Sequence, residues 1–171
     1  DVYKRQTVLA FADVLAGNSS PLLALSYSAS FAVSGVAFAV FMRSRNSGEK
    51  QTAKAGAVSA IMGATEPAMY ALIKPDKKRF ALCCAGGALG GATAGFFGIS
   101  MHAYAGMGIT GLFGFFQTGD VKLVGVLLMA VLPFGFTWLI EMLLYRQEKA
   151  VESEEIIVMP VSYTHLRAHE T

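Results

Sequence analysis

Four long runs of hydrophobic residues, separated by short polar segments, dominate the pattern of this chain. Three of them are uncharged over 18 residues or more and lie at 21–42, 81–100 and 123–140. At about 1.5 Å per residue, helices of this length reach roughly 27–33 Å, which matches the hydrocarbon core of a bilayer. The pattern therefore predicts an all-α membrane protein with three transmembrane helices, the last of which continues past Glu141 to residue 145.

The fourth apolar run, Ala55 to Ile73, carries one charged residue, Glu66, and has basic residues on both sides. Cytoplasmic loops carry the excess of Lys and Arg, so a single crossing would leave one basic cluster on the wrong side. We therefore expect a re-entrant helical hairpin over 55–73, with its tip at Gly63 to Pro67. The flanking basic residues are Arg43, Arg45, Lys50 and Lys54 on one side, and Lys74, Lys77, Lys78 and Arg79 on the other.

The composition agrees with a membrane protein. The chain is 54% hydrophobic and 15% charged, whereas soluble domains are near 25% charged. No charged residue occurs from Phe80 to Gly119. A net charge of +2 gives no strong field for nucleic acid, and none is expected as a partner. The adjacent cysteines, Cys83 and Cys84, lack the spacing of a metal or redox site, so we expect no metal and no cofactor.

Both ends of the chain look foreign to the rest. Residues 1–6 and 162–171 resemble translated sequencing-adapter sequence and are set aside. Residues 7–146 would then form the membrane domain. Residues 147–161 would form a charged cytoplasmic linker followed by an apolar segment that is typical of the start of another domain. Because no initiator methionine or signal peptide is present, we expect a piece of a larger protein.

Glu66 is the main candidate for function. A charged side chain in hydrocarbon costs roughly 2.5–3.5 kcal/mol and usually faces a cavity or a partner. Its carboxylate accepts two hydrogen bonds at once, as two adjacent sugar hydroxyls would donate. Gly63 permits a positive φ at the end of the first half-helix, and Pro67 fits the first turn of the second, with Glu66 or Thr65 at its cap. Two other interpretations stay open: Glu66 only caps the hairpin near the head groups, or it binds a coupling proton or cation.

A resemblance to a known family rests on the same residues. The segment Gly63-Ala64-Thr65-Glu66-Pro67-Ala68-Met69-Tyr70 resembles the G-I-T-E-P-A-[IL]-[YF] signature of the membrane-embedded IIC component of bacterial sugar phosphotransferase systems, in the glucose, β-glucoside and sucrose branch. The likeness extends from roughly Ser28 to Arg146, and residues 154–161 resemble the start of a IIA domain. Ala64 and Ala71 depart from the usual isoleucine and glycine, which bears on the sugar more than on the family.

The resemblance implies sugar translocation across the bacterial cytoplasmic membrane, coupled to phosphorylation of the sugar. The phosphocysteine of a IIB domain would transfer its phosphoryl group to a sugar hydroxyl, often the 6-OH, with Glu66 as the catalytic residue that orients or deprotonates that hydroxyl. The implied partners are the sugar, phosphorylated IIB, IIA, the lipid membrane and a second copy in a homodimer. From the basic flanks of the hairpin we also expect a cytoplasmic carboxy terminus. The substrate-binding residues would be Gly63, Thr65, Glu66, Pro67 and Tyr70.

Several weaker hypotheses accompany this one. The competing functions are an ion- or proton-coupled carrier or channel that uses Glu66, and a truncated, inactive piece. His102 and Tyr104, in the expected outer loop, are candidates for contact with incoming sugar or for interfacial anchoring. The basic segment from Lys77 to Arg79 is a candidate docking surface for IIB. Small residues with four-residue spacing predict close helix packing; they are Gly86, Gly87, Gly90, Gly91, Ala94, Gly95 and Gly98.

Overall fold

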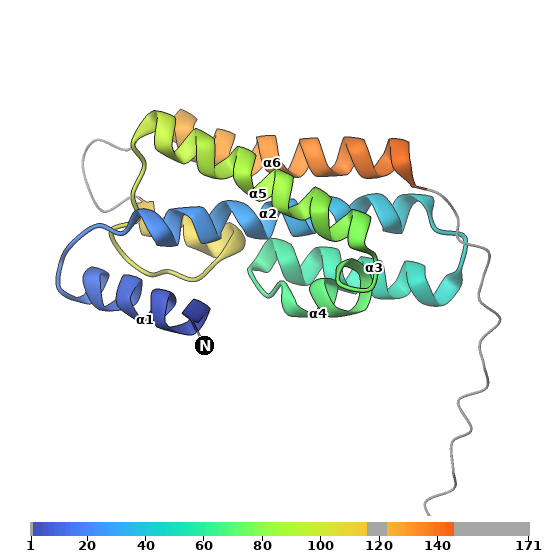
Figure 1. Cartoon of the computed structure of the whole chain (residues 1–171), viewed down its shortest axis with the longest axis horizontal. Coiled ribbons are helices and arrows are strands. Elements are labelled where there is room, and N and C mark those ends of the chain that lie inside the picture. Colours follow the sequence, from blue (N-terminus) through green and yellow to red (C-terminus); the bar gives the residue numbers. More distant parts are fainter. Residues whose placement is uncertain (1, 116–122, 146–171) are drawn as a thin grey trace, which may run out of the picture.

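The computed structural model describes residues 2–115 and 123–145, with side chains from residue 8 onward, and within these ranges it contains no strand. The segments 147–161 and 162–171 lie outside the described residues. The elements are α1 (Val2–Leu15), α2 (Pro21–Arg43), α3 (Ser47–Met62), α4 (Glu66–Ala68), the π-helix η1 (Met69–Ile73), α5 (Lys77–Phe97), the 3-10 helix η2 (Gly108–Phe115) and α6 (Leu123–Leu144). Figure 1 shows the long helices side by side.

Three of the described helices are long and apolar enough to cross a membrane, judged by length and composition: α2, α5 and α6. The expectation of an all-α membrane protein with three such helices is confirmed. Helix α2 forms the centre of the bundle, because 72% of its apolar window is buried, against 22% for α5 and 28% for α6. Figure 1 accordingly shows α2 between the α5–α6 pair and α3. Helix α5 begins four residues earlier than expected, since the Asp76 side chain caps it by accepting from the Lys78 N–H at 2.8 Å.

Helix α5 packs closely on α2 and α6 along one of its two small-residue stripes. A Cβ on Gly90 would lie 2.5 Å from Ser28 Cβ and 2.7 Å from Pro133 Cγ, so only glycine fits there. Gly86 is equally close to the Thr137 side chain. A Cβ on Gly87 would instead meet nothing within 4 Å. The expected close packing is therefore found, but on the stripe that contains Gly86 and Gly90.

The chain reverses direction between α3 and α4, which confirms the expected helical hairpin. The two arms touch, because a Cβ on Gly56 would lie 3.0 Å from Ala68 Cβ. The inner face of α3 consists of small buried residues packed on α2, and the Ser34 hydroxyl donates to the Ala57 carbonyl at 3.3 Å. The first arm begins at Ser47 rather than residue 55, because the Asn46 side chain caps the helix by accepting from the Gly48 N–H at 2.9 Å.

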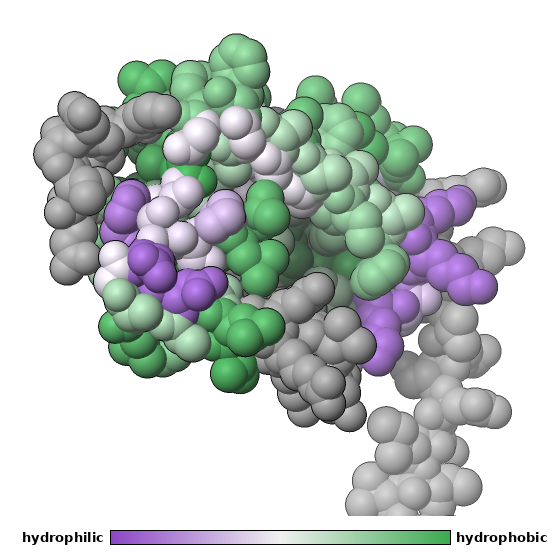
Figure 2. Space-filling model, turned by 60° about the vertical axis from the view of Figure 1, so that its left-hand side comes forward, coloured by the Kyte–Doolittle hydropathy of each residue, from purple (hydrophilic) through white to green (hydrophobic). Residues whose placement is uncertain are grey.

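Both basic segments that flank the hairpin come to the same end of the bundle, which we call the base of the hairpin. Arg79, from the second segment, forms an ion pair of 3.3 Å with Glu49, which lies within the first. Large hydrophobic side chains remain exposed on the bundle surface, including Phe96 at 86% and Leu143 at 75%. Figure 2 shows hydrophobic residues over much of the visible face and hydrophilic residues gathered toward its two ends. This distribution fits a protein surrounded by lipid.

The segment expected as an outer loop contains a helix that the sequence analysis did not predict. Helix η2 lies beside the end of α3 in Figure 1, on the side away from the base. Gly108, at the start of η2, is so close to the Ile61 carbonyl that a Cβ there would clash, and Gly63 is equally close to the Met107 carbonyl. The tip of the hairpin therefore meets a segment that reaches toward it from the opposite end of the bundle.

Candidate functional site

The hairpin tip has the backbone geometry that its sequence predicts. Gly63 ends α3 with φ of 105°, a region that favours glycine, and its N–H donates to the Ala60 carbonyl at 3.0 Å. Thr65 occupies the N-cap position of α4, and Pro67 lies in its first turn. The Thr65 side chain, however, makes no capping hydrogen bond, so the expected side-chain cap is absent at this position.

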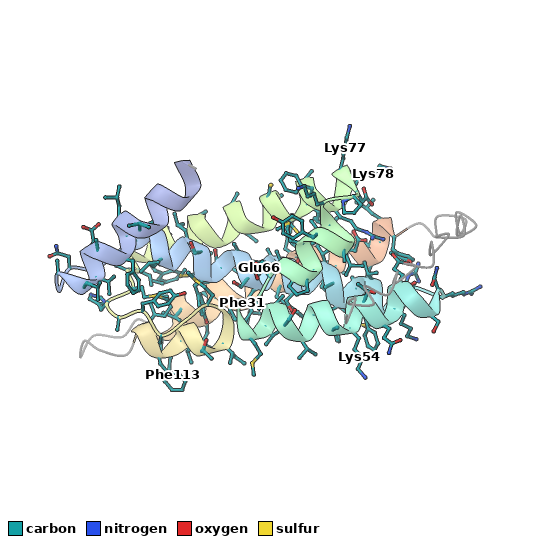
Figure 3. All side chains as sticks on the ribbon, turned by 90° about the horizontal axis from the view of Figure 1, so that it is seen from below. Phe31, Lys54, Glu66, Lys77, Lys78 and Phe113 are labelled. Carbon is teal, nitrogen blue, oxygen red and sulfur yellow. The ribbon has the colours of Figure 1, made fainter. Side chains whose placement is uncertain are left out.

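Glu66 lines an open groove of about 970 Å³ between the two arms of the hairpin. We call it the carboxylate groove. Figure 3 shows Glu66 at the start of the second arm. Three of the expected site residues, Glu66, Pro67 and Tyr70, come together in this groove, whereas Gly63 and Thr65 form the turn and do not line it. The full lining is Gly48, Gln51, Thr52, Ala55, Glu66, Pro67, Tyr70 and Ala71.

The first arm supplies half of this groove, which the sequence analysis did not anticipate. Its four lining residues lie at positions 48, 51, 52 and 55, a spacing that places them on one face of a helix. The three- and four-residue spacing among these residues was the signal that could have identified them as one face of the first arm. Gln51 brings an amide that both donates and accepts, and Tyr70 brings an aromatic face that is 64% exposed. A carboxylate, an amide and an aromatic ring suit a polyhydroxylated ligand.

A second, smaller groove is also lined by Tyr70. Its volume is about 300 Å³, and its lining residues are Met69, Tyr70, Lys74, Lys77 and Phe80. We call it the lysine groove. The Lys74 ammonium lies 4.9 Å from the centre of the Tyr70 ring, within the range of a cation–π interaction. Tyr70 is thus the common wall of the two grooves.

A buried ionic cluster joins the base of the hairpin to the spanning helices, and Arg79 is its centre. The Arg79 Nε atom lies 3.0 Å from Glu141 on α6, and Nη2 lies 3.3 Å from Glu49 on α3. The Nη1 group donates to the Leu72 carbonyl at 3.3 Å. The side chains of Arg79 and Glu141 are only 14% and 7% exposed. One guanidinium therefore links α3, η1 and α6 to the first turn of α5.

The Glu49 carboxylate receives further donors in the same cluster. The Ser44 hydroxyl donates to it at 2.7 Å, and the Tyr145 hydroxyl does so at 3.1 Å. Burial raises the pKa of Tyr145 above its ordinary value, so the phenol keeps the proton that it donates. The sequence analysis treated the basic residues here as topology signals and missed the cluster. An isolated acid in the last apolar run, Glu141, was the available signal, because such a group needs a partner.

The remaining candidates lie apart from the grooves. Tyr104 packs edge-on against Phe11, with ring centres 5.3 Å apart. His102 is half-buried, and its Nδ1 atom has no hydrogen-bond partner. Neither lines the carboxylate groove or the lysine groove. Across residues 2–115 and 123–145, no group of three or more His, Cys, Asp and Glu side chains is arranged to hold a metal ion.

Comparison with known proteins yields several relatives of one kind. The chain is 42% identical over 85 residues to the PTS system beta-glucoside-specific EIIBCA component of Bacillus subtilis, covering 50% of this chain and 14% of the relative. It is 33% identical over 112 residues to the component of the same description from Halalkalibacterium halodurans, covering 66% and 18%. It is also 32% identical over 132 residues to the sucrose-specific EIIBC component of Bacillus subtilis, covering 77% and 25%.

The chain thus spans about a quarter or less of the length of these three relatives. No family model matches it, and no solved structure does so significantly. The relatives share the designation EIIBC or EIIBCA, and this chain has three helices suited to crossing a membrane in the part that the structure describes. The chain is thus a homologue of part of these phosphotransferase-system EII components for beta-glucosides and sucrose, and its three long apolar helices are consistent with a fragment of their membrane-embedded IIC component.

Proposed function

We propose that this chain forms part of the path by which a sugar crosses the bacterial cytoplasmic membrane and is phosphorylated. The observation that carries the proposal is the position of Glu66, a carboxylate at the tip of a hairpin, in an open groove with Gln51 and Tyr70. The relatives' descriptions name beta-glucosides and sucrose, which present adjacent hydroxyls of the kind that a carboxylate binds. The substrate is therefore a β-glucoside or a sucrose-like sugar.

The orientation that we propose places the base of the hairpin in the cytoplasm. Lys74, Lys77 and Lys78 lie at this end, and basic residues are retained on the cytoplasmic side. Helix α6 ends there too, since Glu141 pairs with Arg79. The carboxy terminus would then be cytoplasmic, where IIB and IIA domains of the relatives' kind reach the base. The family resemblance also implies a homodimer.

In the proposed reaction, Glu66 binds the sugar and assists the attack of one hydroxyl. The hydroxyl oxygen forms a bond to phosphorus while the bond between phosphorus and the cysteine sulfur of IIB breaks. The hydroxyl proton passes to the Glu66 carboxylate, and the leaving group is the cysteine thiolate. IIA then rephosphorylates IIB. A positioned general base contributes roughly 10²–10⁴-fold to such a step.

The test compares Glu66→Gln with Asp13→Asn in the full-length protein. Asp13 is an exposed carboxylate on α1 and lines neither groove. Uptake of labelled arbutin, salicin, cellobiose and sucrose into cells, and formation of sugar phosphate, are measured for each variant. We expect Glu66→Gln to lose at least 100-fold in phosphorylating uptake of the accepted sugar, and Asp13→Asn to stay within twofold. Near-normal transport by Glu66→Gln would contradict the role of Glu66.

The same assay separates this function from an ion-coupled carrier. Uptake by a phosphotransferase component requires a phosphoryl donor and delivers sugar phosphate. Uptake by an ion-coupled carrier would follow a proton or sodium gradient, stop when an ionophore collapses it, and deliver unmodified sugar. The second result would overturn the proposed function and leave Glu66 as a coupling carboxylate.

A further inference from the structure

We propose that the lysine groove is the subsite for the phosphoryl group that the sugar receives, with Lys74 and Lys77 as its ligands. The inference rests on the proposed function and extends it from the sugar to the phosphoryl group. The ligand is a phosphoryl dianion, bonded either to a sugar oxygen as a phosphate monoester or to a cysteine sulfur as S-phosphocysteine. It is carried either by the sugar phosphate product or by the phosphorylated donor domain.

The charge at the lysine groove is uncompensated, in contrast to the charge on Arg79 nearby. Among the residues that the structure describes, Lys74 and Lys77 form no ion pair, whereas Arg79 pairs with Glu49, Asp76 and Glu141. The Asp76 carboxylate is the acid adjacent in sequence to the groove. It is engaged by Arg79 Nε at 3.6 Å and by a backbone N–H at 2.8 Å. The groove therefore keeps a net positive charge, as a phosphoryl dianion requires.

The geometry places this charge next to the sugar-binding groove. Tyr70 lines both grooves, so the groove that contains Glu66 and the groove that contains the two lysines adjoin at this side chain. The π-helix η1 forms this wall, and its wide turn is closed by the Lys74 N–H, which donates to the Met69 carbonyl at 2.7 Å. Segments of this kind occur often at functional sites. Lys77 is also the first residue of α5, where the helix adds partial positive charge.

Lys78 provides a matched control. It is an exposed lysine in the same basic segment, but it does not line the groove. Figure 3 labels Lys77 and Lys78 as neighbours at the start of α5. If the lysines serve only to retain this end in the cytoplasm, loss of any one of them has the same effect. If the groove binds a phosphoryl group, Lys74 and Lys77 matter and Lys78 does not.

The experiment uses the full-length protein in nanodiscs and measures equilibrium binding. The first probe is whichever of arbutin, salicin, cellobiose and sucrose binds the wild type, and the second is its 6-phosphate. We expect the double variant Lys74→Gln/Lys77→Gln to weaken binding of the 6-phosphate at least tenfold and to keep the Kd for the unmodified sugar within twofold. Lys78→Gln should leave both values within twofold, and Lys74→Arg/Lys77→Arg should retain most of the affinity for the 6-phosphate.

A second arm identifies the source of the phosphoryl group. It measures the KM for the phosphorylated IIB domain in the same variants. An increase in this KM without a change in binding of the 6-phosphate assigns the groove to the donor, and the reverse assigns it to the product; either supports the subsite. If the double variant changes neither quantity while sugar binding is intact, the inference is overturned and the proposed function stands. If the wild type binds none of the four sugars, the proposed function fails first and the inference fails with it.

Discussion

The base and the tip of the hairpin are held in place by different interactions. At the base, a buried arginine binds carboxylates from two other helices, Glu49 and Glu141, at 3.3 Å and 3.0 Å. At the tip, Gly63 and Gly108 bring backbone against backbone, with no charged group taking part. The difference shows how Glu66 can stay available. Because backbone hydrogen bonds and close backbone contacts hold the tip, the Glu66 carboxylate forms no structural ion pair within the part of the chain that the structure describes.

The two kinds of attachment fail in different ways. When one partner of a buried ion pair is removed, the protein is strongly destabilised, because the other charge stays buried without a partner. A close backbone contact tolerates loss of charge but does not tolerate an added atom. The base should therefore be sensitive to charge removal, and the tip to small increases in volume.

The largest effect is expected from Arg79→Ala in the full-length protein. This change leaves Glu141, which is 7% exposed, without its cation, at a cost of about 3–5 kcal/mol. The measurement is the midpoint of thermal unfolding in detergent. The double variant Arg79→Met/Glu141→Met removes both charges and should recover most of the loss, while Glu49 keeps the hydroxyl donors Ser44 and Tyr145. Equal destabilisation in the single and double variants would show that packing, rather than charge pairing, holds the base.

A smaller effect is expected at the tip from Gly63→Ala. Alanine is strained at φ of 105°, and its Cβ would clash with the Met107 carbonyl, so we expect a loss of about 1–3 kcal/mol in the same thermal assay. Gly87→Ala is the matched control. A Cβ there meets nothing within 4 Å, and alanine in a helix is favoured over glycine by about 0.5–1 kcal/mol. A tip that tolerates alanine as well as position 87 does would refute the close contact.

The smallest effect concerns Tyr145, at the edge of the base. Tyr145→Phe removes one hydrogen bond to Glu49 and should cost about 1 kcal/mol near neutral pH. Because burial raises the folded-state pKa of Tyr145, its contribution is complete below the ordinary tyrosine pKa of about 10. Above that pH the unfolded chain loses the proton first, so the stability of the wild type falls as pH rises. Unfolding curves from pH 8 to 11 should show this fall in the wild type and a smaller one in Tyr145→Phe.

Much of this architecture was predictable because hydrophobic runs and basic flanks report on membrane crossing directly. The three long helices and the reversal at Gly63 follow from that pattern, and the positive φ of Gly63 was expected from its residue type. The predicted start of α3 was wrong because it was set by the uncharged run, which begins at residue 55. The helix itself begins earlier, after the capping side chain of Asn46. The start of a helix is often set by one residue whose side chain caps it, and a hydropathy pattern does not show such a residue.

The site was predictable only in part, because the sequence pattern does not show which residues far apart in the chain come into contact. The motif around Glu66 located one wall of the carboxylate groove, but Gln51 on the other wall became visible only when the two arms were placed together. Likewise, Glu49 and Arg79 are 30 positions apart, and nothing local pairs them. Helix η2 lies in the segment that was expected as an outer loop, where the hydropathy pattern predicted no helix.

The π-helix between Glu66 and Arg79 has a consequence for how this protein can vary. Its closing hydrogen bond spans one residue more than that of an α-helix, so the segment holds a spare residue. Deleting one position within 69–73 would allow the wide turn to tighten into a regular one while the residues on either side keep their places. A deletion between Tyr70 and Lys74 would shorten their spacing from four residues to three and so change the relative direction of the two side chains about the helix axis. The shape of the wall between the two grooves can thus change by a single deletion, without any change in the residues that form the tip or the base.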